Sequence, residues 1–99
     1  MAEAKSGVIA VTTAGTAVQG PDTGPGEYII GADPANTGFI YVGNDGAGDV
    51  ASTNGFKLGA GSVVIVVAGS LSAYWFDSSV NGEKATWLKA APGGAVRVA

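Results

Sequence analysis

The chain has 99 residues, a formal net charge of −3, and neither histidine nor cysteine. Its five basic residues are scattered, which excludes the basic stripe that nucleic-acid binding requires and removes any attraction to an anionic membrane. The absence of histidine and cysteine excludes Ser-His-Asp and Cys-His catalytic systems and the usual zinc sites. We therefore expect no enzyme, no cofactor, and no nucleic-acid or membrane partner.

The length predicts a single domain over residues 1–99. Residues 1–6 are polar and lack the basic start and long apolar run of a secretion signal, so we expect a flexible arm on a protein made in the cytoplasm. The first strand is expected over residues 7–13, continuing over 16–19. Residues 20–26 contain two prolines and three glycines, which predicts a surface loop.

Two further strands are predicted in the next part of the chain. Residues 27–33 alternate so that Tyr28, Ile30 and Ala32 share one face. Residues 33–38 form a turn signal of proline, asparagine and glycine, after which 39–43 are expected as a strong strand. A glycine-rich loop over 44–49 and a short extended piece over 55–58 follow.

The segment over residues 62–68 is the most hydrophobic in the chain and is rich in β-branched residues. A strand that is apolar on both faces is normally covered on both sides. We therefore expect this strand to be covered by a second sheet, another strand layer or a neighbouring subunit.

The last third of the chain predicts a strand over residues 71–76 and a hairpin at Asn81-Gly82. A type I′ turn needs positive φ at both central positions, which asparagine and glycine tolerate. A two-residue turn there would place Phe76 opposite Trp87 as a cross-strand aromatic pair. A final short strand is expected over 95–98. Seven to nine short strands at these spacings predict an all-β fold, a small antiparallel β-sandwich or β-barrel.

The acidic residues lie mostly beside glycine, proline or asparagine, which favours solvated turn residues over a catalytic pair. The most specific alternative is a calcium site in residues 44–49, where Asp45 and Asp49 could offer oxygen ligands. The EF-hand pattern is absent from this loop, so an ordinary turn is the favoured interpretation.

Three consecutive aromatic residues, Tyr74, Trp75 and Phe76, cannot all point into one core, because neighbouring strand residues alternate between faces. Core packing is the first interpretation of the aromatic residues. A protein interface is the second, with Tyr74 and Phe76 as its side chains, and a carbohydrate-binding platform is the third.

Several motifs between Ile30 and Leu88 occur together in a familiar order. The stretch Ala32-Asp33-Pro34-Ala35-Asn36-Thr37-Gly38-Phe39-Ile40-Tyr41-Val42-Gly43 is followed by Asn54-Gly55-Phe56-Lys57-Leu58-Gly59-Ala60-Gly61, the apolar strand and Asn81-Gly82-Glu83-Lys84. This order resembles small virion proteins of tailed phages, a group similar to capsid decoration (cement) proteins. The resemblance covers about 60 residues. It implies a β-sandwich or β-barrel and transfers no catalytic residue.

The resemblance implies a structural virion protein that binds the outside of a phage capsid, bridges major capsid protein subunits and stabilises the shell. Such a protein is made in the host cytoplasm, resides on the capsid surface of the virion and is expected as a trimer or dimer. The alternatives are a head–tail, tail or fibre-associated module and a carbohydrate-binding β module. Candidate contacts come from residues 1–13, the loop 20–26 and the aromatic run: Val8, Ile9, Val11, Pro21, Pro25, Tyr74 and Phe76.

Overall fold

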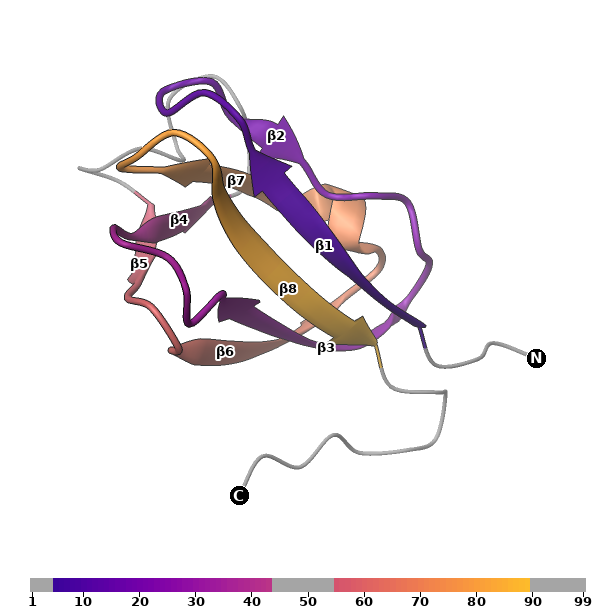
Figure 1. Ribbon diagram of the computed structural model, residues 1–99. Helices are drawn as coiled ribbons and strands as arrows, with labels where there is room; N and C mark the ends of the chain where they lie inside the picture. Colours follow the sequence, from indigo (N-terminus) through magenta and orange to yellow (C-terminus); the bar gives the residue numbers. More distant parts are fainter. Residues whose placement is uncertain (1–4, 44–54, 90–99) are drawn as a thin grey trace.

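The computed structural model describes residues 5–43 and 55–89, and within them the chain forms two four-stranded antiparallel sheets packed as a sandwich (Figure 1). One sheet has the strand order β1-β8-β3-β6 and the other β2-β7-β4-β5. The all-β prediction is confirmed. Because both sheets have open edges, the fold is a sandwich and not a closed barrel. The strands are β1 (Lys5–Val11), β2 (Val18–Gln19), β3 (Gly26–Ala32), β4 (Ile40–Gly43), β5 (Phe56–Leu58), β6 (Val63–Ala68), β7 (Trp75–Ser78) and β8 (Glu83–Lys89).

The hydrophobic core lies between the two sheets and follows the period-two pattern of the strands. Tyr28, Ile30 and Ala32 of β3 all point into it, as their spacing predicts. The rings of Tyr28 and Trp87 are tilted against each other with centroids 6.1 Å apart. The other members of the core are Ile9, Val11, Ile40, Val42, Leu58, Leu71, Phe76 and Ala85.

Strand β1 begins earlier than the sequence predicts. Lys5 and Ser6, which we expected in the flexible arm, pair with Lys89 and Leu88 of β8. Both side chains are exposed, and the backbone hydrogen bonds of a strand do not depend on apolar side chains. The polar composition of this segment therefore reflects the exposure of its side chains, and it does not prevent the backbone from pairing with β8.

The predicted Asn81-Gly82 hairpin is wrong. Strand β7 pairs with β2 and β4, whereas β8 pairs with β1 and β3, so this turn carries the chain from one sheet to the other. Positive φ occurs at Gly82 and not at Asn81, which rules out a type I′ turn. The Gly82 N–H donates to the Val11 carbonyl over 2.9 Å and holds the turn against β1.

The predicted Phe76–Trp87 pair is wrong for the same reason. Phe76 lies opposite Val18 and Val42, whereas Trp87 lies opposite Gly7 and Ile30. The two large rings enter the core from opposite sheets, where each is buried between the layers. A hairpin would instead have put both rings on one face of one sheet.

The predicted strand over residues 71–76 is in part a short 3₁₀ turn, η1 (Leu71–Ala73). The Ser70 hydroxyl caps it by accepting from the Ser72 backbone N–H, and the Tyr74 N–H closes it on the Leu71 carbonyl. A serine that bonds its neighbouring backbone competes with extended structure. The strand therefore starts only at Trp75, which shortens the aromatic run on the sheet.

No helix among residues 5–43 and 55–89 is long and apolar enough to cross a membrane.

Candidate interaction surface

The sheet β1-β8-β3-β6 has an outer face, directed away from the core, that is unusually apolar. On strand β6, alternate side chains turn outward, with exposed fractions of 48% for Val63, 43% for Ile65 and 77% for Val67. The intervening Val64, Val66 and Ala68 pack against the core from the other side. The apolar pattern on both faces thus reflects one core face and one exposed face, since no described segment covers the outer side.

Strand register joins these outward side chains to those of the neighbouring strands. Ile65 lies opposite Ile29, and Ile29 lies opposite Leu88, which gives one apolar row across three strands. Val8 of β1 is 60% exposed and lies on the same face, opposite Thr86. We call this surface the outer apolar face, and its members are Val8, Ile29, Val63, Ile65, Val67 and Leu88.

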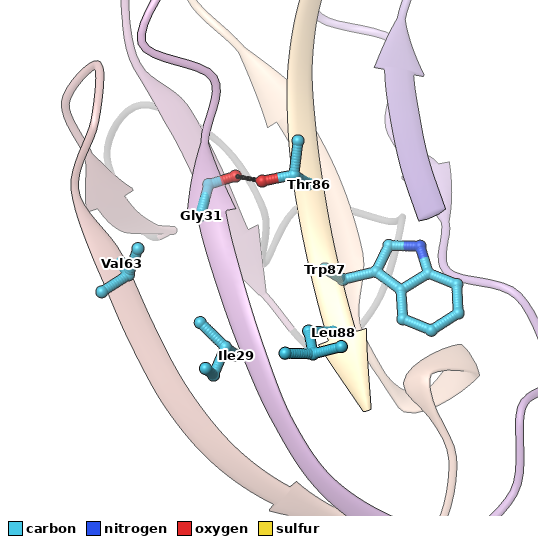
Figure 2. A pocket seen from close by; sticks show the side chains of 6 residues that line it. All are labelled: Ile29, Gly31, Val63, Thr86, Trp87 and Leu88. Atoms are coloured by element: carbon cyan, nitrogen blue, oxygen red, sulfur yellow. Dashed lines mark hydrogen bonds between the residues drawn. The ribbon is translucent and has the colours of Figure 1, made fainter. Parts of the chain in front are cut away.

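A shallow depression of about 170 Å³ lies in the outer apolar face at Gly31 (Figure 2). Val63 and Thr86 flank it along one cross-strand row, and Ile29 and Leu88 line the next row. Gly31 has no side chain to fill the space, and a Cβ there would meet the Val63 Cγ1 at 3.1 Å. The lining is apolar apart from the Thr86 hydroxyl, so the depression suits an apolar side chain of a partner.

The structure buries three of the seven candidate contact residues in the core of the sandwich. Ile9, Val11 and Phe76 are buried in the core, because each lies on the inner face of its strand. Tyr74 is half-buried and packs against the core from the end of η1. Val8 is the one strand residue of the set whose side chain is exposed on the outer apolar face.

The loop over residues 20–26 lies at the surface and exposes Pro21 and Pro25. Its backbone is held by neighbouring segments. The Thr23 N–H donates to the Ser70 hydroxyl over 3.0 Å, and the Lys89 Nζ donates to the Thr23 carbonyl over 2.5 Å. The Tyr28 hydroxyl donates to the Gly24 carbonyl over 2.5 Å. The two prolines are therefore presented on a fixed loop at the end of the sandwich.

The two motifs at residues 32–43 and 81–84 bond to each other. The Asn36 side chain donates to the Lys84 carbonyl over 2.8 Å and accepts from the Lys84 N–H over 3.0 Å, as a backbone pairing partner would. The Gly38 N–H donates to the buried Glu83 carboxylate over 2.5 Å. These motif residues hold the β3–β4 turn against the start of β8, so their contribution is structural.

Replacing Asn36 with alanine is expected to lower the free energy of unfolding by about 1–2 kcal/mol, because two hydrogen bonds to Lys84 are lost at the surface. Urea denaturation measures the change. The matched control is Gln19→Ala, which removes a single exposed bond to the Ser72 carbonyl and is expected to have at most about half that effect. Equal effects of the two variants would show that the paired hydrogen bonds between Asn36 and Lys84 stabilise the fold no more than one exposed hydrogen bond does.

Most of the outer apolar face was not among the candidates chosen from the sequence. The sequence predicts cover on both sides of the apolar segment over residues 62–68 and does not single out the outward side chains Ile29, Val63, Ile65, Val67 and Leu88. These side chains are at least partly exposed because no described segment forms a layer over this side of the sheet, at the edge strand β6 and at the interior strand β8 alike. Sequence alone does not give which face of a sheet is covered, so an apolar strand with one exposed face and one with two covered faces are not separable.

The described residues contain no group of three or more carboxylate, histidine or cysteine side chains placed to hold a metal ion. Asp45 and Asp49, the alternative calcium ligands, lie outside the described residues. Within the same part of the chain, every buried side-chain nitrogen or oxygen has a hydrogen-bond partner.

No protein-family model, no curated protein and no solved structure matches the chain.

Proposed function

We propose that the chain is a structural virion protein that binds the outside of a phage capsid and stabilises the shell by bridging major capsid protein subunits. The observation that carries the proposal is the outer apolar face, a broad sheet surface whose large side chains have no cover among the described residues. Contiguous exposed apolar surface on a small domain typically marks an interaction site. The motif order that resembles small tailed-phage virion proteins supports the choice of partner.

The physical logic of this role follows from the shape of the sandwich. Each of the eight strands is hydrogen-bonded to a neighbour in its sheet, and the two sheets share one core, so the face can dock without rearrangement. Contacts of this kind are individually weak, and many copies on a symmetric shell multiply their effect through avidity. A head–tail, tail or fibre-associated role would use the same surface at far fewer copies per particle. The copy number of the chain in the virion therefore distinguishes capsid decoration from these other roles.

Co-sedimentation with undecorated shells, assembled from the major capsid protein of the same phage genome, tests the proposal. We expect saturable binding of the unaltered chain and a loss of at least about tenfold in apparent affinity for Val8→Glu, because a charge would be buried unpaired against the shell. The control is Val80→Glu, which changes another exposed valine on the β7–β8 turn and is expected to bind normally.

Two results would contradict the proposal. The first is failure of the unaltered chain to sediment with the shells at saturating concentration. The second is an equal loss of binding for Val8→Glu and Val80→Glu, which would place the contact somewhere other than the outer apolar face. Val8 lies on β1, at the opposite edge of its sheet from β6, so this test is separate from any property of the β6 edge.

A further inference from the structure

Four strands lie at the edges of the two sheets, and β6 differs from the other three. β2 and β5 have two and three residues, and short edge strands offer little backbone for pairing. β1 is longer but carries the charged Lys5. β6 has six residues, no charge and no proline, so it lacks the short length, the charges and the proline that commonly protect a sheet edge from pairing with another chain.

No strand among residues 5–43 and 55–89 pairs with the outer edge of β6, and the register shows which backbone groups are directed toward that edge. The Ala32 N–H donates to the Ser62 carbonyl over 2.9 Å, which marks that pair as hydrogen-bonded. Because hydrogen-bonded pairs recur at every second residue of an antiparallel ladder, Val64 and Val66 direct their backbone groups toward β3. The N–H and C=O groups of Val63, Ile65 and Val67 therefore point away from the sheet.

The sequence of β6 is the same in both directions about Ile65: Val63-Val64-Ile65-Val66-Val67. Two copies related by a two-fold axis through Ile65 would pair antiparallel with valine opposite valine and isoleucine opposite isoleucine. Val63, Ile65 and Val67 of each copy, whose backbone groups point away from β3, would then form about six hydrogen bonds with the same residues of the second copy. No charge lies in this segment, so no like charges meet across the two-fold axis.

We propose that β6 is the edge at which a second copy of this chain binds, giving a two-fold dimer with a continuous eight-stranded sheet centred on Ile65. The pairing joins the outer apolar faces of both copies into one surface, with Val63, Ile65 and Val67 of each copy along the seam. A contact that uses the same strand on both subunits closes on itself and stops at the dimer. This inference goes beyond the proposed function and does not depend on capsid binding.

Sedimentation equilibrium of the full chain tests the proposal across a concentration series. We expect a monomer–dimer equilibrium whose dissociation constant rises at least about tenfold in Ile65→Lys, because two like charges would lie directly opposite each other. The matched control is Leu88→Lys. Leu88 has the same 43% exposure on the same face, but its strand β8 is paired on both sides, so we expect the dimer to persist. Circular dichroism checks that both variants are folded.

Single cysteines test the register, since the chain has none of its own. Under mild oxidation Ile65→Cys should form a disulfide-linked dimer, because paired Cα atoms about 5.5 Å apart permit the bond. Val67→Cys should not form this disulfide, because Val67 would lie opposite Val63 of the second copy and about 13 Å along the strand from Val67 of the second copy.

An unaltered chain that is a monomer or a trimer at every concentration would overturn the proposal. Equal weakening by Ile65→Lys and Leu88→Lys, or equal cross-linking of the two cysteine variants, would overturn it as well.

Discussion

Replacing Phe76 with alanine is expected to lower the free energy of unfolding by about 3–5 kcal/mol, the range for a fully buried phenylalanine in a core. The Phe76 side chain has no exposed surface and lies between Val18 and Val42 on its own sheet, facing the opposite sheet across the core. Its removal leaves a cavity that two hydrogen-bonded sheets cannot close. For a domain of this size the loss is a large fraction of the free energy of unfolding, so the melting temperature is expected to fall by many degrees.

The matched control for this prediction is Phe56→Ala. Phe56 is 58% exposed on the edge strand β5, so its removal should change the free energy of unfolding by less than about 1 kcal/mol. Urea denaturation of both variants measures the difference. If Phe76→Ala were as stable as the unaltered chain, Phe76 would not be a core residue, and its interpretation as an interface side chain would return.

Replacing Gly20 with alanine is expected to be the second largest effect, a loss of about 1–3 kcal/mol from overpacking. A Cβ at Gly20 would overlap the van der Waals surface of the Leu71 backbone carbonyl oxygen. Gly20 is buried, and its N–H donates to the Tyr74 carbonyl over 2.9 Å, so neither segment can move aside without breaking that bond. The expected result is a lower melting temperature and a lower urea midpoint.

Gly69→Ala is the control for this substitution. No atom lies within 4 Å of a Cβ built at Gly69, and its φ is not in the left-handed region. Alanine there should be neutral or slightly stabilising, because it reduces the conformational freedom of the unfolded chain. Equal losses for Gly20→Ala and Gly69→Ala would show that the close approach of Gly20 to η1 is not what constrains this position.

The parts of the fold that sequence predicts well are those that local pattern determines. The alternation of Tyr28, Ile30 and Ala32 identified their shared buried face, and the density of turn residues identified the loop over 20–26. Both depend only on neighbours along the chain. The all-β class, as a small antiparallel sandwich or barrel, followed from the number and spacing of such strands, and the arrangement of the sheets shows that it is a sandwich.

The parts that sequence missed depend on which strands lie side by side. Asn81-Gly82 has the composition of a tight hairpin turn, but the chain uses it to cross between sheets, which separates Phe76 from Trp87. The exposure of Ile65 likewise follows from the lack of a described layer over the outer face of its sheet, which no local pattern encodes. Residue type alone likewise did not show which face of its strand Phe76 occupies, and the side chain is buried in the core.

Density for the intact particle at a resolution that separates strands would show which surface of the sandwich faces the shell. We expect the chain on the outer surface of the shell, with the β1-β8-β3-β6 sheet directed at the major capsid protein and Val8 within the contact. Density that places the β2-β7-β4-β5 sheet against the shell, or a particle that contains none of this chain on its capsid surface, would contradict this expectation.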